Sequence, residues 1–219
     1  MGNGIPRDWR RGIICPIFKK GEKDEAKNYR GITLLVTAYK IYAGILNERV
    51  KKDIEGRLAE GQFGFREGRG AIDAIYVLNH LVNKELSKTK RKADCLFHRP
   101  KSGMIRLTMI RRAMIDRLKE MEVKRNLRRR ITEIYMETGN VVKIEEERTE
   151  EFWTTRGVRQ GCPLSPTLFN AFLSDIEEDM SKVQEGGVVI GREKVRTILY
   201  ADRTSSDDRS GDEGDAEKV

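Results

Sequence analysis

Apolar side chains recur at helical spacing in four stretches of this chain, and this periodicity limits the folds that the chain can adopt. The spacing predicts amphipathic helices over residues 33–52, 71–86, 113–136 and 165–183. Short strand-like runs accompany them at residues 13–18, 141–144, 151–155, 187–190 and 194–200. Ser165 is a candidate N-cap, with Pro166 at the first helical position. These elements predict an α+β fold in which helices back a small antiparallel sheet.

The positive charge of the chain is concentrated in its middle. The net charge is +8, and residues 84–130 alone hold seventeen basic and five acidic residues. A block this basic favours a polyanion partner, with nucleic acid as the first candidate. A solvated helix face followed by a loop explains the same composition, so both interpretations stay open. Residues 203–219 instead hold six acidic and three basic residues, and they are predicted to form an acidic disordered tail.

The cysteines and histidines do not form a recognisable framework. The chain has three widely spaced cysteines and two histidines, without a CxxC or HxxxH pattern. Neither a disulfide scaffold nor a zinc site is therefore predicted. No run of 18 apolar residues occurs in the sequence, so no membrane partner is expected. Free thiols without a secretory leader predict an intracellular protein, in the nucleus or the cytoplasm.

Several short strings follow one another in a characteristic order. They are Pro-Ile-Phe-Lys-Lys-Gly at 16–21, Asn-Tyr-Arg-Gly-Ile-Thr-Leu-Leu at 28–35, Gln-Phe-Gly-Phe-Arg at 62–66, Gly-Val-Arg-Gln-Gly-Cys-Pro-Leu-Ser-Pro at 157–166 and Leu-Tyr-Ala-Asp-Arg at 199–203. In this order they resemble the reverse transcriptase domain of non-LTR (LINE-type) retrotransposons. The resemblance spans most of the chain, from Trp9 to Asp202. It implies the fingers and part of the palm of a right-hand polymerase, without a thumb.

The resemblance implies roles for individual residues. Asp202 matches the first aspartate of the family's Tyr-Ala-Asp-Asp motif, and would be a catalytic ligand of Mg²⁺, which prefers hard oxygen ligands. Arg30 would bind the triphosphate of the incoming deoxynucleotide, because a guanidinium fork suits phosphate oxygens. Gln160 and Gly161 would line the nucleotide and template site. Arg66 would contact the template strand.

Each of these residues also has a purely structural interpretation. Asp202 could be an aspartate in a hairpin turn, and Arg30 a surface arginine. Gln160 and Gly161 could form a turn before a helix. Phe63 and Phe65, which flank a glycine next to Arg66, could be core aromatics rather than template contacts.

Two departures from the family pattern bear on activity. The first palm motif of the family, of the form Phe-x-Asp-Leu-Lys-Ala-Ala-Phe-Asp, is expected between Asp94 and Arg112. Residues 97–106 instead read Phe-His-Arg-Pro-Lys-Ser-Gly-Met-Ile-Arg, without a carboxylate. Arg203 stands where the second aspartate of the last motif is expected. Because a proline and unpaired charges also fit a buried strand poorly, the palm is predicted to be disrupted here.

Shifted reading frames would explain both departures. Codons exist for His-Arg-Pro-Lys-Ser-Gly that, read one base later, encode Thr-Asp-Leu-Lys-Ala-Ala. Codons for Asp-Arg-Thr-Ser-Ser likewise encode Asp-Asp-Val-Val when two bases are skipped after the aspartate. The genetic code thus permits the family motifs to lie out of frame at residues 98–103 and 202–206.

The sequence therefore predicts three regions and one principal function. Residues 1–92 form a fingers-like region, residues 93–202 a partial palm with a disrupted first catalytic strand, and residues 203–219 the acidic tail. The function predicted is that of a catalytically inactive relative of RNA-directed DNA polymerases, a nucleotidyltransferase pseudoenzyme. Its partners by resemblance are an RNA template, a DNA primer and deoxynucleotides. The alternatives are a non-catalytic nucleic-acid-binding relic and a degenerate, non-functional open reading frame.

Overall fold

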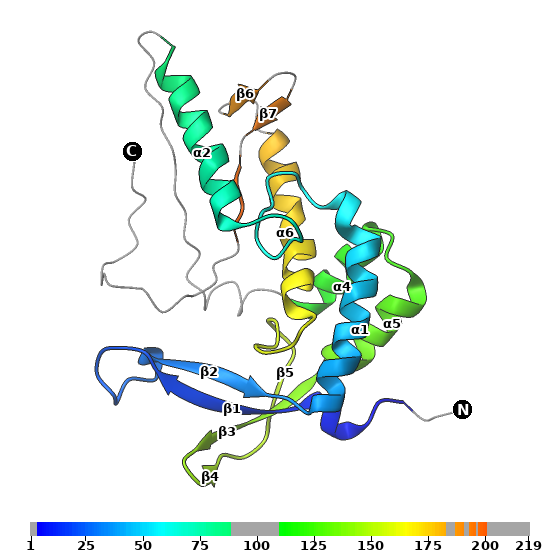
Figure 1. Cartoon of the computed structure of the whole chain (residues 1–219). Helices are drawn as coiled ribbons and strands as arrows, with labels where there is room; N and C mark the ends of the chain where they lie inside the picture. Colours follow the sequence, from blue (N-terminus) through cyan, green and yellow to red (C-terminus); the bar gives the residue numbers. More distant parts are fainter. Residues whose placement is uncertain (1–3, 89–109, 183–186, 191–192, 196, 201–219) are drawn as a thin grey trace. The chain divides into compact units, whose positions relative to one another are not determined.

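A computed structural model describes residues 4–88, 110–182, 187–190, 193–195 and 197–200 (Figure 1). The chain divides into two compact units. The first unit consists of Met1–Arg57 and Gly103–Phe172, and the second of Leu58–Ser102 and Leu173–Val219. The division into a fingers-like region at 1–92 and a partial palm at 93–202 stays a prediction.

The first unit contains a mixed sheet with the strand order β2-β1-β3-β4, in which β5 also pairs with β3. The strands are β1 (Arg11–Phe18), β2 (Tyr29–Leu34), β3 (Thr138–Ile144), β4 (Glu147–Arg148) and β5 (Phe152–Thr154). All of these pairs are antiparallel except β1–β3, which is parallel. The sheet is thus rich in antiparallel pairs, as the sequence predicted.

The proline in β1 sits where the sheet tolerates it. Pairing between β1 and β3 ends at Ile14↔Val142, whereas pairing between β1 and β2 continues to Phe18↔Tyr29. Pro16 therefore lies in the part of β1 that has a partner on one side among these strands. A proline, which has no N–H to donate, is compatible with such an edge position.

Four helices complete the described part of the first unit. They are α1 (Thr37–Ile54), α4 (Arg111–Glu120), α5 (Arg125–Tyr135) and the beginning of α6 (Ser165–Lys182), with short 3-10 turns η1 (Arg7–Arg10), η2 (Ala26–Asn28) and η3 (Glu55–Arg57). Figure 1 shows α1, α4 and α5 grouped together, while the β1–β2 hairpin projects away from them. The apolar side chains that recur at helical spacing on these helices form the core of the unit. Its fully buried members include Tyr39, Val50, Ile54, Met114, Leu118, Ile131, Ile134 and Leu168. Burial of such side chains stabilises the unit by about 1.5–3 kcal/mol each.

The predicted helix over residues 113–136 is wrong in one respect, because the structure has two helices there. The break has the hydrogen bonds of a Schellman motif. The N–H of Val123 donates to the carbonyl of Leu118 over 2.9 Å, and the N–H of Glu122 donates to that of Lys119 over 3.0 Å. Glu122 adopts φ 53°, a conformation that glycine usually supplies. Without a glycine at this position, the sequence carried no clear stop signal.

The beginning of the first predicted helix is also wrong. Thr33 and Leu34 belong to β2, and α1 begins at Thr37. Residues 29–34 were not predicted as a strand, since Gly31 and Arg30 interrupt the apolar alternation. The predicted helices at 71–86 and 165–183 and the strands at 13–18, 141–144 and 151–155 are confirmed to within a few residues.

The second unit contains α2 (Ala71–Leu86), the end of α6 and the hairpin of β6 (Val188–Ile190) and β7 (Glu193–Val195). The loop before α2 is tied to residue 199. The N–H of Phe63 donates to the Leu199 carbonyl, and the N–H of Leu199 donates to the Gly61 carbonyl, both over 2.8 Å. Lys84 on α2 donates to the Val189 carbonyl of β6 over 2.8 Å. Gly191, predicted to lie in the hairpin turn, is outside the described residues.

Candidate functional site

The segment Gly157–Ser165 is the part of the first unit in which the motif residues Gln160 and Gly161 lie. Two glycines shape it, Gly157 with φ 72° and Gly161 with φ 89°. Both values are in the left-handed region, which glycine adopts without strain. Ser165 begins α6, but its hydroxyl donates to the Arg159 carbonyl over 2.7 Å. The hydroxyl of Ser165 therefore bonds to the segment that precedes the helix, whereas the sequence predicted that it would cap the helix N-terminus.

Arg159 anchors this segment to the N-terminal part of the unit. Its side chain is buried, and its guanidinium donates to the carbonyls of Trp9 over 2.9 Å and Arg11 over 3.0 Å. The same guanidinium lies 4.7 Å from the ring centre of Tyr39, within the range of a cation–π contact. Two backbone oxygens and an aromatic face thus hold this buried cation and fix the turn relative to β1, although its Nε has no hydrogen-bond partner within the described part of the chain.

Tyr135 at the end of α5 closes a ring of hydrogen bonds with the segment. Its hydroxyl accepts the backbone N–H of Arg159 over 2.7 Å and lies 2.8 Å from the Ser165 hydroxyl. Because Ser165 donates to the Arg159 carbonyl, Tyr135 is left to donate to Ser165. Burial, together with the nearby Cys162 thiol, raises the pKa of the Tyr135 phenol well above its ordinary value. Tyr135 therefore stays a neutral donor and acceptor.

Tyr39 makes a similar buried contact from α1. Its hydroxyl lies 3.0 Å from the sulfur of Cys162. Burial, followed by the interaction with Cys162, raises the pKa of Tyr39 far above its ordinary range, although the cation of Arg159 acts in the opposite direction. This tyrosine thus packs as a neutral group under the turn.

Arg111 at the start of α4 is the second buried cation, only 2% exposed. It donates to the carbonyls of Thr154 over 2.7 Å, Tyr135 over 2.8 Å and Gly157 over 2.9 Å, and to the Thr138 hydroxyl over 3.1 Å. Burial lowers the pKa of the Arg111 guanidinium. One planar fork thus joins α5, β3, β5 and the motif segment, which a single ammonium could not do.

The motif turn also touches β2, the strand that carries Arg30. A side chain at Gly161 would place its Cβ 2.9 Å from the Thr33 carbonyl oxygen, so only glycine allows this approach. Arg30 pairs with Ile17 across the hairpin. It lies three residues before Thr33, a separation of about 10 Å along an extended strand. The structure therefore places Gly161 against the strand that carries Arg30, and a site shared by Arg30, Gln160 and Gly161 stays a prediction.

Arg66 lies in the second unit and braces its own loop. Its guanidinium donates to the Ala59 carbonyl over 2.8 Å and to the Gln62 carbonyl over 3.3 Å. Phe65 nearby has φ 56° and is 41% exposed, while the Arg69 guanidinium lies 5.5 Å from the ring centre of Phe63. Arg66 thus has a structural role in this loop, and its template contact stays a prediction.

The predicted metal ligand Asp202 and residues 97–106 lie outside the described residues. Within the part of the chain that the structure describes, no group of three or more His, Cys, Asp or Glu side chains could hold a metal ion. The described residues therefore offer no donor set that fits a Mg²⁺ ion. The described helices also include none long and apolar enough to cross a membrane.

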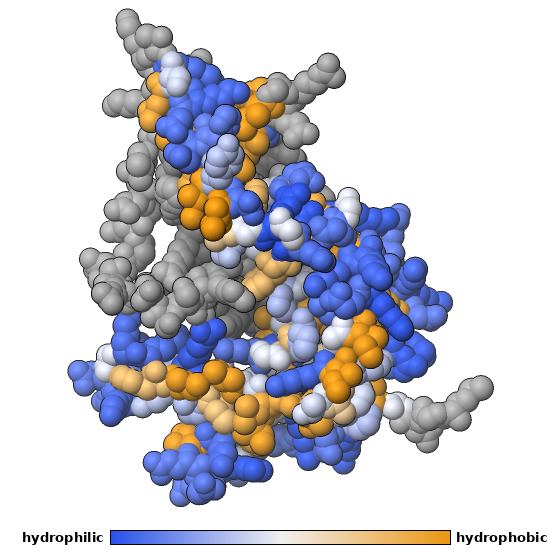
Figure 2. Space-filling model, viewed as in Figure 1, coloured by the Kyte–Doolittle hydropathy of each residue, from blue (hydrophilic) through white to orange (hydrophobic). Residues whose placement is uncertain are grey.

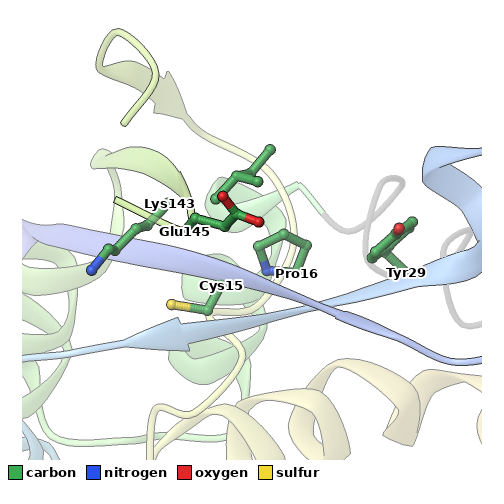
Figure 3. Close-up of a pocket in the computed structure, with 6 residues that line it drawn as sticks. Cys15, Pro16, Tyr29, Lys143 and Glu145 are labelled. Carbon is green, nitrogen blue, oxygen red and sulfur yellow. The ribbon is translucent and has the colours of Figure 1, made fainter. Parts of the chain in front are cut away.

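A shallow groove of about 400 Å³ opens where the β1–β2 hairpin meets the end of β3 (Figure 3). Its lining is Cys15, Pro16, Tyr29, Lys143, Ile144 and Glu145. It offers one carboxylate and one ammonium, without a second acidic group beside Glu145. The lining shows no donor set for a metal and no cluster of cations for a triphosphate.

Arg111, Arg159, Tyr39 and Tyr135, which together build this site, were not singled out from the sequence. A signal existed for Arg111, because Arg111, Met114 and Leu118 are spaced at i, i+3 and i+7 and all three are buried. A charged residue on the apolar stripe of a helix points to a buried, hydrogen-bonded cation.

Comparison with known proteins supports the family resemblance that the order of motifs indicated. The family model described as reverse transcriptase (RNA-dependent DNA polymerase) matches residues 17–204. The transposon TX1 149 kDa protein of Xenopus laevis is 27% identical over 214 residues, covering 90% of this chain and 15% of that protein. The Pol polyproteins of the type-1 retrotransposable element R2 are both 24% identical, covering 90% of this chain in Popillia japonica and 88% in Nasonia vitripennis. The chain spans 27% and 18% of the lengths of these two R2 proteins.

Proposed function

Because the chain belongs to the reverse transcriptase (RNA-dependent DNA polymerase) family, we propose that it is the reverse transcriptase domain of a LINE-type element that binds nucleic acid without polymerising. The observation that carries this proposal is the loss of carboxylates at the expected metal positions. Arg203 occupies the place of the second aspartate in the last motif, and residues 97–106 hold no acidic side chain. The named relatives are proteins of a transposon and of a retrotransposable element, which supports the LINE-type origin.

The geometry of the first unit supports retained binding of a nucleotide or a strand. Gln160 and Gly161 lie in a turn that two buried arginines hold in place, next to the strand of Arg30. A guanidinium on that strand suits phosphate oxygens. We propose that Arg30 binds the triphosphate of a deoxynucleotide and that Gln160 and Gly161 line its site.

The carboxylate count argues against catalysis. Divalent metals supply the clamp on the attacking and leaving oxygens in nucleotidyl transfer, and carboxylates hold them there. Asp202 alone, followed directly by the cation of Arg203, is a poor donor set for Mg²⁺. Loss of the clamp removes several kcal/mol of transition-state stabilisation, and at about 1.4 kcal/mol for each tenfold change the rate falls by about a thousandfold or more.

The setting that fits this function is intracellular, where free thiols persist. Cys15 and Cys162 are both free thiols in the structure. A primed RNA template and deoxynucleotides are the partners that we propose.

A paired assay on the full chain tests the proposal. Fluorescence anisotropy measures binding of a primed RNA template, and gel electrophoresis measures extension of the same primer. Binding with salt dependence and without extension is the expected result. Binding that does not change in Arg30→Gln, compared with Lys40→Gln as a control on the exposed face of α1, would contradict the assigned site. A chain without a cooperative thermal transition would instead favour a degenerate reading frame.

A further inference from the structure

Helix α5 presents an unusually basic face. Residues 124–130 read Lys-Arg-Asn-Leu-Arg-Arg-Arg, with five basic and no acidic side chains. The side chains of Lys124, Arg129 and Arg130 are 82%, 63% and 46% exposed. Figure 2 shows a hydrophilic surface over this helix. The cations are therefore available to a partner.

The basic face points away from the site described above. Leu127, Ile131 and Ile134 are buried, and the hydroxyl of Tyr135 reaches the motif segment. At 100° per residue, Arg125 and Arg129 lie on the opposite side of the helix from this buried stripe. A partner on the basic face would thus be separate from the nucleotide site.

Nearby acids neutralise this face only in part. Glu133 pairs with both Arg129 and Arg130, at 3.9 and 3.0 Å, and Asp53 pairs with Lys124 at 3.8 Å. The side chain of Arg125 has no hydrogen bond or ion pair within the described part of the chain. Arg128 is half-buried and donates to the Val123 carbonyl over 2.9 Å. Within the described part of the chain, two carboxylates thus face four exposed cations.

The charges near the N-terminal end of α5 oppose the stability of the helix, whereas Arg129 and Arg130 gain a little from their pairs with Glu133. Lys124 and Arg125 lie at the N-terminal end of α5, where the helix dipole favours acidic side chains. Arg125 and Arg129 are like charges four residues apart, a spacing that is destabilising. A cluster that opposes the stability of its own helix indicates a role in binding.

We propose that the exposed face of α5 binds the phosphate backbone of a nucleic acid, independently of the nucleotide site. Exposed arginines suit phosphate oxygens and read charge rather than sequence. An anionic membrane is the less suitable partner, because a helix that lies on a membrane must insert an apolar face, and the apolar residues of α5 are buried in the protein. The ligand class is thus RNA or DNA, recognised through its backbone.

The test is the salt dependence of binding by the full chain. Anisotropy is measured with single-stranded RNA and with duplex DNA between about 50 and 200 mM salt. The double variant Arg125→Gln, Arg129→Gln removes two cations from α5. A matched double variant, Lys40→Gln, Arg49→Gln, removes two exposed cations from α1. Thermal melts of both variants establish that the fold is retained.

The α5 variant is expected to flatten the slope of log K against log salt by about 1.4 for single strands and about 1.8 for duplex DNA. The preferred nucleic acid is the one whose affinity at a fixed salt concentration falls further in the α5 variant, and the α1 variant should leave the slope unchanged. Equal effects of the two variants would overturn the proposal, as would no effect of the α5 variant. Loss of binding only to phosphatidylserine vesicles would also overturn it, in favour of a membrane. Primer extension and the Arg30→Gln variant test the proposed polymerase-like site separately.

Discussion

Replacement of Arg111 by methionine tests whether a buried cation organises the candidate site. The guanidinium donates to three backbone carbonyls within 2.9 Å, those of Thr154, Tyr135 and Gly157. Methionine fills part of the volume but leaves these acceptors without their donor. An unsatisfied buried acceptor costs about 1–3 kcal/mol, while removal of the charge relieves part of the desolvation penalty. With three such acceptors left without a donor and part of the cost offset by the lost desolvation penalty, we expect a net loss of about 3–5 kcal/mol.

Urea unfolding of the full chain measures this loss. For an m-value of about 2 kcal/mol per molar urea, the midpoint should fall by about 2 M. Arg112 is the matched control, since it is the next residue on α4 and is exposed. Arg112→Met should change stability by no more than about 0.5 kcal/mol. Arg111→Lys should be intermediate, because an ammonium keeps the charge but not the planar fork.

The comparison between the two arginines decides the outcome. If Arg111→Met and Arg112→Met shift the midpoint equally, the Arg111 network does not stabilise the segment that carries Gln160. The account of how the site is built would then be refuted.

Three further predictions follow from the structure and the sequence. Because burial raises the pKa of Tyr39 and Tyr135 above their ordinary value of 10.0, the unfolded chain loses these protons first. Below about pH 10 the two tyrosines therefore leave the free energy of unfolding unchanged, and above about pH 10 each should lower it by about 1.4 kcal/mol per pH unit. Urea unfolding between about pH 9 and 11 measures this change. Gly161→Ala should destabilise the chain by about 1–2 kcal/mol, because residue 161 has a positive φ and a Cβ there would crowd β2. Gly44→Ala in α1 is the control, since a Cβ at that position meets open space, and it should stabilise the chain by about 0.5–1 kcal/mol. Equal melting temperatures of the two variants would contradict this prediction. Sequencing of the encoding DNA should reveal the first palm motif out of frame at residues 98–103, and no such motif in any frame would reject the frame-shift explanation.

The sequence predicted the elements that carry strong periodic signals. The helix at 71–86 was predicted with its bounds, and β1 was found despite Pro16. These elements depend on local patterns, which a single sequence displays. Strand β2 was missed, because its pairing with β1 compensates for a weak alternation of its own.

The site was predicted less completely than the fold. Gln160, Gly161 and Arg30 were named from motifs, and the structure places the turn of Gly161 against the strand of Arg30. The supporting residues were missed because their roles depend on contacts between distant parts of the chain. Arg159 and Trp9, for example, are separated by 150 positions and joined by one hydrogen bond. Composition and spacing do not reveal such partners.

The central claim is that this reverse transcriptase family domain binds a primed template without extending it. The most direct measurement is primer extension on an RNA template by the full chain, with deoxynucleotides and either Mg²⁺ or Mn²⁺, at salt concentrations at which anisotropy shows the template bound. We predict that the unmodified chain and Asp202→Asn leave the primer unextended to the same degree. Template-dependent extension by the unmodified chain that is abolished in Asp202→Asn would contradict the account.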